Sequence, residues 1–327
     1  MTIKHLVIPG GGPSGIQAIG ALQQLEKSGF WNINDIKTIY ATSAGAITAL
    51  LLALKFDWES INDYIILRPW QETYNVNISQ IFEAYSKKGI FDHSIFAIFY
   101  KPFFEAKDLA LTMTMKEFYE YSGIEMHFFS LELNSFEIVD ISHKTFPDIS
   151  ILTAVHMSSA IPMIITPICI EEKCFVDGGV VLNYPLKYCV ENEKNVDEIF
   201  GIQNVYKEYE TNIVNKGSTI LDYIIHFTSQ LIKKASKDQT YDNIIPYELK
   251  YDVNLMGLDN MKETLRSPDY RKGLLDKGRH AADEFLSSLG PEKWPSSTGM
   301  KDAGIAEDDT TKETMDPETA NHEPRID

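Results

Sequence analysis

The sequence predicts an α/β protein of three layers (α/β/α), in which helices cover both faces of a mainly parallel central sheet. Two observations carry this prediction. An apolar run over residues 3–9 meets a glycine-rich turn and then a helical apolar stripe, and a second apolar run, residues 36–41, again leads straight into a helix. Strands that alternate with helices in this way favour a parallel sheet with right-handed crossovers.

The elements after this opening follow a less regular order. Residues 58–121 have mainly helical spacing and hold many aromatic side chains, and the alternation at 128–133 and 136–141 predicts two paired strands. The remaining expected elements are a helix at 149–157, strands at 164–170, 174–176 and 199–205, and helices at 220–234 and 270–289. We find no internal repeat.

Composition limits both the domains and the partners. The chain has 327 residues, 44% of them hydrophobic, and we expect one catalytic domain over 1–290, with its motifs at 3–190 and a helical part at 215–290. Residues 291–327 are expected to form an acidic disordered tail, since residues 301–327 hold no aromatic side chain. The net charge of −17 argues against nucleic acid, and against an anionic membrane unless a local patch outweighs it.

The chain has three cysteines, Cys169, Cys174 and Cys189, and no two of them have the Cys-x-x-Cys spacing. Their odd number argues against a disulfide framework or a zinc site, so we expect reduced thiols in a cytosol-like compartment. The N-terminus lacks the pattern of a signal peptide, and the longest apolar run, residues 44–54, is too short to cross a bilayer. The expectation is therefore a soluble cytoplasmic protein, with peripheral membrane contact left open.

A glycine-rich stretch follows the first strand: Gly10, Gly11, Gly12, Pro13, Ser14 and Gly15. Its Gly-x-Gly-x-x-Gly spacing is also the dinucleotide-binding fingerprint, which requires an acid at the C-terminal end of the second strand. Asp35 has roughly that spacing, but it precedes the second strand. We favour an oxyanion loop, because glycines let backbone N–H groups approach a developing negative charge closely.

The second strand ends in Ala41-Thr42-Ser43-Ala44-Gly45 and becomes a helix at once. This is the context of a Gly-x-Ser-x-Gly nucleophile elbow, with Ala41 in place of the first glycine. Ser43 is the candidate nucleophile, although a serine at this position is also a common helix N-cap. The partial positive charge of the helix N-terminus would favour an oxyanion there.

A nucleophilic serine needs a base. His156, His226 or His280 could complete a Ser-His-Asp triad, but none has a distinctive sequence context. Asp177 is the better candidate, because Asp177-Gly178-Gly179 follows an apolar strand. An Asp-Gly pair is also a common turn, and a free carboxylate is a weak base, so Asp177 would have to be buried near Ser43 to act.

Taken together, the glycine loop, the elbow and the Asp177 turn resemble the three motifs of the patatin-like phospholipase family in order and spacing. The segments MSSAIPMIITP (157–167) and GGVVLNYPL (178–186) also look like the stretches before and after the family's aspartate, with Asn183 and Pro185 in place. The resemblance covers about residues 3–190.

This resemblance implies a patatin-like fold and a Ser43–Asp177 dyad without histidine, which forms an acyl-enzyme on a lipid ester at a membrane or micelle interface. It implies no metal and no cofactor. The residues that it assigns to the oxyanion hole are Gly10, Gly11, Gly12, Ser14 and Gly15, and those that support the elbow and the turn are Ala41, Thr42, Ala44, Gly45, Gly178 and Gly179.

The sequence departs from the family pattern at two positions, and these departures put the catalytic efficiency and the preference for a lipid headgroup in doubt. Ala41 replaces a glycine, and Ser14 stands where many members carry Arg or Lys. A lipid acyl hydrolase of the phospholipase A type is the leading hypothesis. A catalytically silent or activator-dependent lipid-binding protein and an acyltransferase stay open as alternatives, as do headgroup, sn-position, chain length and oligomeric state.

Residues 89–104 carry six aromatic side chains at helical spacing. They form either a lid that contacts lipid or a buried helix over the sheet, and the helical spacing favours the buried helix. We expect any membrane contact of this chain to be local and weak.

Overall fold

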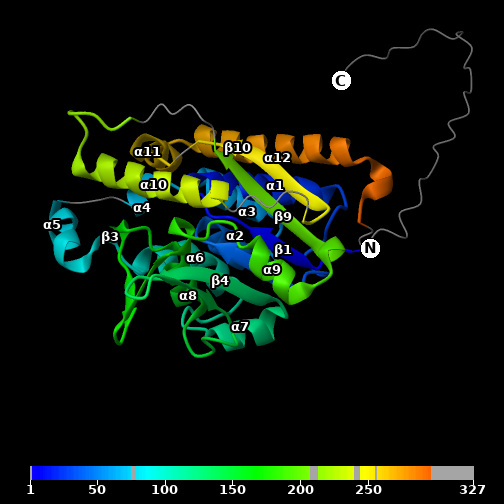
Figure 1. Cartoon of the computed structure of the whole chain (residues 1–327), viewed down its shortest axis with the longest axis horizontal. Helices are drawn as coiled ribbons and strands as arrows, with labels where there is room; N and C mark the ends of the chain where they lie inside the picture. Colours follow the sequence, from blue (N-terminus) through cyan, green and yellow to red (C-terminus); the bar gives the residue numbers. More distant parts are fainter. Residues whose placement is uncertain (1, 75–77, 207–212, 239–243, 255, 296–327) are drawn as a thin grey trace, which may run out of the picture.

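The computed structural model describes residues 2–74, 78–206, 213–238, 244–254 and 256–295 (Figure 1). Within these residues an eight-stranded sheet has the order β10-β9-β1-β2-β4-β8-β7, and β5 pairs with β4 outside this path. Its strands are β1 His5–Ile8, β2 Thr38–Thr42, β4 Glu125–Glu132, β5 Glu137–Ile141, β7 Ile168–Ile170, β8 Lys173–Asp177, β9 Ile199–Tyr206 and β10 Tyr247–Val253. A second, two-stranded sheet pairs β3 Gly89–Phe91 with β6 Met163–Ile165.

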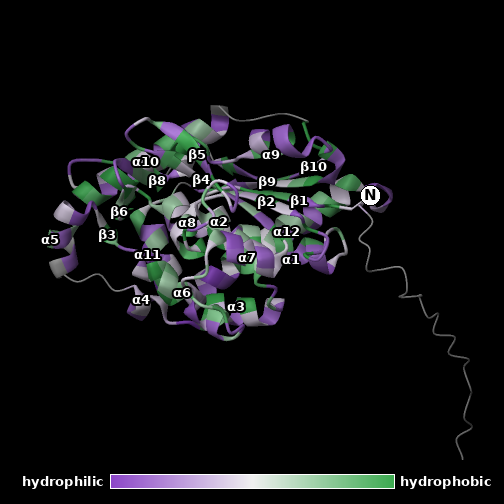
Figure 2. Cartoon of the chain, turned by 90° about the horizontal axis from the view of Figure 1, so that it is seen from below, coloured by the Kyte–Doolittle hydropathy of each residue, from purple (hydrophilic) through white to green (hydrophobic). Residues whose placement is uncertain are grey.

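Helices cover both faces of the large sheet, with α9 and α10 on one side and α1, α2, α3, α6, α8 and α12 on the other (Figure 2). The helices are α1 Gly15–Lys27, α2 Ala44–Ala53, α3 Trp58–Leu67, α4 Trp70–Thr73, α5 Ile78–Lys87, α6 Ser94–Glu105, α7 Met115–Ser122, α8 Ile151–Ser159, α9 Leu186–Glu193, α10 Ile220–Asp238, α11 Leu258–Arg266 and α12 Pro268–Leu289. The predicted three-layer α/β/α class is confirmed.

The central strands are apolar because their side chains pack into two hydrophobic cores, one on each face of the sheet. On β1, Leu6 and Ile8 belong to the larger core, whereas Val7 between them belongs to the smaller core on the opposite face. On β2, Tyr40 likewise faces away from Ile39. Since successive side chains of a strand point to opposite faces, a strand covered on both sides must be apolar throughout.

The strands β10, β9, β1, β2 and β4 are parallel to one another, whereas β5 and β8 are antiparallel to β4 and β7 is antiparallel to β8, so the expectation of a mainly parallel sheet is confirmed. The strand expected at 164–170 is instead two strands, β6 and β7, separated by Pro167, which has no N–H for a ladder. Sequence patterns did not indicate β10, an edge strand that exposes Lys250 and Asp252 between buried residues.

The expectation of reduced thiols is wrong for two of the three cysteines. Cys169 and Cys174 form a disulfide, and only Cys189 is a free, buried thiol. The antiparallel register of β7 and β8 places Cys169 directly opposite Cys174. Cysteine number and spacing gave no hint of this pairing, because the hairpin register brings the two side chains together.

The boundary of the expected tail is also too early. Pro291–Lys293 forms a short 3-10 turn, Trp294 packs against the larger core, and the Tyr247 hydroxyl donates a hydrogen bond to the Lys293 carbonyl. Trp294 therefore anchors residues 291–295 to the domain. The rest of the expected disordered tail, 296–327, lies outside the described residues.

Candidate active site

Strands β2 and β8 end next to each other along one side of β4. Thr42, the last residue of β2, pairs with Phe129, and Asp177, the last residue of β8, pairs with Ser130. Both of these β4 residues also pair with β5, so β2 and β8 must share the remaining side of β4. Because β2 runs parallel to β4 and β8 antiparallel, their C-terminal ends converge, and Ser43 and Asp177 meet there.

The turn at Ser43 has the geometry of a nucleophile elbow. Ser43 occupies the N-cap position of α2 with φ 56° and ψ −123°, a conformation that is costly for a non-glycine residue and typical of strained functional turns. A Cβ at Gly45 would stand 2.4 Å from the Ile8 carbonyl oxygen, so only glycine lets the turn lie so close to β1. Ala41, the departure from the motif, is fully buried in the larger core.

Serines on α8 hold the elbow in place. The Ser43 N–H donates to Ser158 Oγ at 3.0 Å, and the Ser158 hydroxyl in turn donates to the Phe129 carbonyl. Ser159 Oγ donates to the Ser43 carbonyl at 3.1 Å. The MSSAIP segment therefore holds both the backbone N–H and the backbone carbonyl of Ser43.

The hydroxyl of Ser43 donates to Asp177 Oδ2 at 2.6 Å. The other oxygen, Asp177 Oδ1, accepts the Gly179 N–H at 2.7 Å, and the whole Asp177 side chain is inaccessible to solvent. Burial raises the pKa of Asp177 to about 6, against the opposing effect of the hydrogen bonds from Ser43 and Gly179. A carboxylate with this pKa is ionised at neutral pH and basic enough to accept a proton from a serine.

The glycine loop offers two N–H groups to a ligand. Three N–H groups of the loop already have backbone acceptors. Gly10 N–H donates to the Asn183 carbonyl, and Ser14 N–H donates to the Gly11 carbonyl. Gly15 N–H donates to the carbonyls of Gly12 and Pro13. Among the hydrogen bonds between described residues, the N–H groups of Gly11 and Gly12 have no acceptor. Of the five residues expected to form an oxyanion hole, these two are the ones with available donors.

Gly10 is needed for a different reason. A Cβ there would stand 2.9 Å from Ser43 Cβ and 2.6 Å from Asn183 Oδ1, so glycine allows the loop to lie directly beside Ser43. The Gly10 carbonyl accepts hydrogen bonds from Asn204 Nδ2 at 2.6 Å and Asn183 Nδ2 at 3.3 Å. Sequence reasoning missed Asn204, whose signal was a polar residue within the apolar strand β9.

The three histidines considered as bases have other surroundings. His156 is buried, its Nε2 lies 2.7 Å from the Thr166 carbonyl, and burial lowers its pKa to about 4. His226 contacts Gln230 on its own helix, and His280 pairs with Glu284 at the surface. Within the described part of the chain, none of the three is bonded to Ser43, so the Ser-His-Asp alternative has no geometry to support it.

Two cavities adjoin beside the glycine loop, and the smaller of them is lined by both Ser43 and Asp177. The smaller has a volume of about 20 Å³ and is lined by Ser43, Asp177, Asn183 and Tyr206, among others. The larger has a volume of about 310 Å³ and is almost wholly apolar; its walls include Ile16, Ile19, Ile47, Ile65, Trp70 and Phe99. Both cavities are bordered by Gly12, Ile161 and Met256, so the apolar cavity begins beside the glycine loop.

The aromatic segment 89–104 contributes side chains to the larger core and to the wall of the apolar cavity. Four of its side chains, Phe96, Tyr100, Phe103 and Phe104, are buried in the larger core, which confirms the buried-helix interpretation for α6. Phe91 and Phe99 line the apolar cavity instead. The segment forms part of the wall of this cavity rather than an exposed apolar lid.

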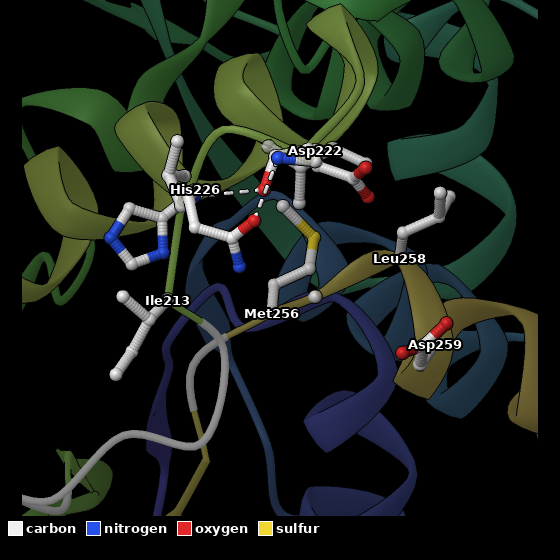
Figure 3. Close-up of a pocket in the computed structure, with 12 residues that line it drawn as sticks. Ile213, Asp222, His226, Met256, Leu258 and Asp259 are labelled. Atoms are coloured by element: carbon white, nitrogen blue, oxygen red, sulfur yellow. Dashed lines mark hydrogen bonds between the residues drawn. The ribbon is translucent and has the colours of Figure 1, made fainter.

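A third cavity of about 370 Å³ lies between α10 and the start of α11 and is mostly polar. Figure 3 shows Met256 among the residues that line it, between Asp222 and His226 of α10 and Leu258 and Asp259 of α11. Met256 borders all three cavities and thus stands between this outer cavity and the dyad.

The described residues lack two further features, a metal-binding cluster and a membrane-spanning helix. They contain no group of three or more His, Cys, Asp or Glu side chains arranged to hold a metal ion. None of their helices is both long enough and apolar enough to cross a membrane.

Comparisons with known proteins give a family match and two viral relatives. The family model for patatin-like phospholipases matches residues 6–190. A protein described as probable lipid hydrolase 463L, from Invertebrate iridescent virus 6, is 26% identical over 223 residues, or 64% of this chain and 73% of that protein. The uncharacterized protein R571 of Acanthamoeba polyphaga mimivirus is 26% identical over 202 residues, or 61% of this chain and 65% of that protein.

The fold is also found among solved structures. The crystal structure of VipD from Legionella pneumophila superposes with a TM-score of 0.52 and covers 88% of this chain and 67% of that chain, at 16% sequence identity. At this level of identity the likeness shows that the two chains share a fold.

Proposed function

We propose that this chain, which belongs to the patatin-like phospholipase family, is a lipid acyl hydrolase of the phospholipase A type that works through a Ser43–Asp177 dyad. The observation that carries the proposal is the 2.6 Å hydrogen bond from Ser43 Oγ to a fully buried Asp177 carboxylate. A lipid substrate is supported by the apolar cavity beside the dyad and by the description of the relative 463L as a probable lipid hydrolase.

In the first half of the reaction, Asp177 accepts the proton of Ser43 while Ser43 Oγ attacks the ester carbonyl carbon. The carbonyl oxygen becomes an oxyanion, which the N–H groups of Gly11 and Gly12 stabilise; each such donor is worth about 3 kcal/mol in the transition state. The ester bond then breaks, and the leaving alcohol takes the proton from Asp177. Ser43 is left as an acyl ester.

In the second half, a water molecule replaces the alcohol. The cavity of about 20 Å³ at the dyad has room for one water. Asn183 Oδ1 borders this cavity, is buried, and has no hydrogen-bond partner among the described residues, so it is suited to accept a hydrogen bond from the water while Asp177 removes the water's other proton. Attack of the resulting hydroxide releases the fatty acid and returns the proton to Ser43.

The acyl chain fits the apolar cavity. Ile47 lies one turn of α2 beyond Ser43 and lines this cavity, and Pro13 and Ala44 line it next to the glycine loop and the elbow. Burying the chain there removes its methylene groups from water, which stabilises the complex by about 0.8 kcal/mol for each group. The cavity volume of about 310 Å³ is at the lower end of the range for small-molecule sites.

Labelling with a fluorophosphonate probe tests the nucleophile, because the probe reacts only with an activated serine. We expect mass spectrometry to place the label on Ser43, and we expect Ser43→Ala and Asp177→Asn to remove it. Ser229→Ala is the matched control, since Ser229 lines the same cavity without bonding to Asp177. Labelling that survives Ser43→Ala would contradict the proposal.

The products formed from vesicle phospholipid separate the remaining alternatives. Free fatty acid and lysophospholipid in equal amounts indicate hydrolysis. An acylated glycerol formed when glycerol is added indicates acyl transfer. If Ser43 is not labelled even with vesicles present, the silent or activator-dependent lipid-binding alternative takes the place of the hydrolase.

A further inference from the structure

Helix α10 has one face toward the dyad and the opposite face toward solvent. On the inner face, Ser229 and Ile232 line the cavity that contains Ser43 and Asp177. On the outer face, four large apolar side chains are exposed at helical spacing: Ile220 (73%), Tyr223 (52%), Phe227 (55%) and Leu231 (37%). We call these four residues the α10 outer face.

Single exposed apolar side chains are ordinary, but a continuous row of them is not. The row on α10 extends into the segment before the helix, where Ile213 is 72% exposed and Val214 37%. Both of these residues also line the outer cavity, so the apolar surface leads directly to its rim.

The charge of this region is opposite to that of the whole chain. Residues 213–238, which include the whole of α10, contain four lysines (Lys216, Lys233, Lys234 and Lys237) and two acids (Asp222 and Asp238), so this stretch is net positive, whereas the chain carries a net charge of −17. Asp222 accepts hydrogen bonds from the backbone and side chain of Thr219, so its charge is used to cap α10. A helix with a row of apolar residues and flanking lysines has the chemistry of one that lies in the interface of an anionic bilayer.

The α10 outer face lies beside a series of cavities that leads to Ser43 and Asp177. The outer cavity opens beside α10, and Met256 is shared by this cavity, the dyad cavity and the apolar cavity. Met256 is partly buried, and methionine is an unbranched, flexible side chain that can change rotamer at low cost. Among the described residues, Met256 is the one that lines both the outer cavity and the dyad cavity, so a lipid that leaves a bilayer at the α10 outer face would pass this side chain.

We propose that the α10 outer face docks on the surface of an anionic phospholipid bilayer and places the Met256 passage against the lipid. The use of this passage by a substrate rests on the proposed function; the docking itself does not. The aromatic segment 89–104, considered from sequence for membrane contact, is not needed for it. The rest of the chain is strongly negative and is repelled by an anionic bilayer, so the docking is limited to this one surface.

Flotation with vesicles tests the docking without turnover when all variants carry Ser43→Ala. We expect the protein to bind vesicles of phosphatidylcholine mixed with phosphatidylserine more strongly than phosphatidylcholine alone, with a loss of binding at high salt. Phe227→Asp should lower the partition coefficient at least about tenfold, because it removes a large apolar side chain and adds a repelled charge. Leu67→Asp is the matched control: Leu67 is 67% exposed, but it lies on α3, on the opposite side of the sheet (Figure 2).

Two results would overturn the proposal. One is equal vesicle binding by Phe227→Asp and Leu67→Asp. The other is a dimer that Phe227→Asp converts to a monomer with vesicle binding unchanged, which would make this face an interface between copies of the chain. Failure of the proposed function looks different, because Ser43 would then not react with the fluorophosphonate probe while vesicle binding still depended on Phe227.

Discussion

Ser43 and Asp177 are 134 residues apart in sequence, yet their side chains share a hydrogen bond of 2.6 Å because their strands end opposite neighbouring residues of β4. This arrangement makes the dyad depend on strand register. A slip of β8 by one residue would turn Asp177 to the other face of the sheet and separate it from Ser43. The bond from the Asp177 N–H to the Ala160 carbonyl and the bonds from Ser158 and Ser159 to the elbow fix both strand ends from α8.

The raised pKa of Asp177 predicts the acid limb of the pH–activity profile. The base must be ionised to accept the Ser43 proton, so activity should be lost as the pH falls through the pKa of about 6. The measurement is kcat/KM on a soluble short-chain ester, which avoids changes in vesicle binding with pH. Activity that stays constant down to about pH 4, the ordinary pKa of an exposed aspartate, would argue against Asp177 as the base.

Replacing Asp177 should separate activity from stability. The native state raises the pKa of this carboxyl, so the unfolded state releases the proton more readily, and the stability of the wild type falls as the pH rises from about 4 to about 6. Above pH 6 the ionised, buried carboxylate costs up to about 3 kcal/mol. Asp177→Asn should abolish activity and be more stable than the wild type by up to this amount at neutral pH, with the difference shrinking toward pH 4.

The check on this prediction is denaturant unfolding of both proteins across that pH range. Because every other titrating group is common to the two proteins, the difference between them isolates position 177. A variant that is less stable than the wild type at neutral pH would mean that the hydrogen bonds of the carboxylate outweigh its desolvation.

Asn183 should affect the second half of the reaction more than the first. Asn183→Ala removes the acceptor proposed for the hydrolytic water, and we expect deacylation to slow by about tenfold, the value of roughly one hydrogen bond. With a p-nitrophenyl ester, this appears as a burst of released nitrophenol followed by a slower steady rate. Asn204→Ala is the control, because Asn204 also donates to the Gly10 carbonyl but does not line the dyad cavity. If both variants change the burst and the steady rate equally, Asn183 only supports the glycine loop and has no separate role in deacylation.

Much of the fold and the centre of the site could be predicted from sequence because local patterns encode them. Apolar runs that end in glycine or serine marked β1 and β2, and the short motifs identified Ser43 and Asp177. What sequence did not show depends on pairing at a distance. The Cys169–Cys174 disulfide follows from the register of a hairpin, and the contact of Asn204 with the glycine loop follows from the packing of β9 beside β1.

The apolar cavity should set the acyl chain length that the dyad accepts. Ile47→Trp places a larger side chain in the cavity one turn of α2 from Ser43, so it should exclude long acyl chains while a short chain still reaches the nucleophile. We expect the ratio of kcat/KM for a dodecanoyl ester to that for an acetyl ester to fall at least about tenfold, since excluding a few methylene groups costs a few kcal/mol of transition-state binding. An unchanged acetyl ester rate shows that Ser43 and Asp177 are intact in this variant. If the ratio does not change, the acyl chain occupies a different surface, and the outer cavity between α10 and α11 becomes the place to look for it.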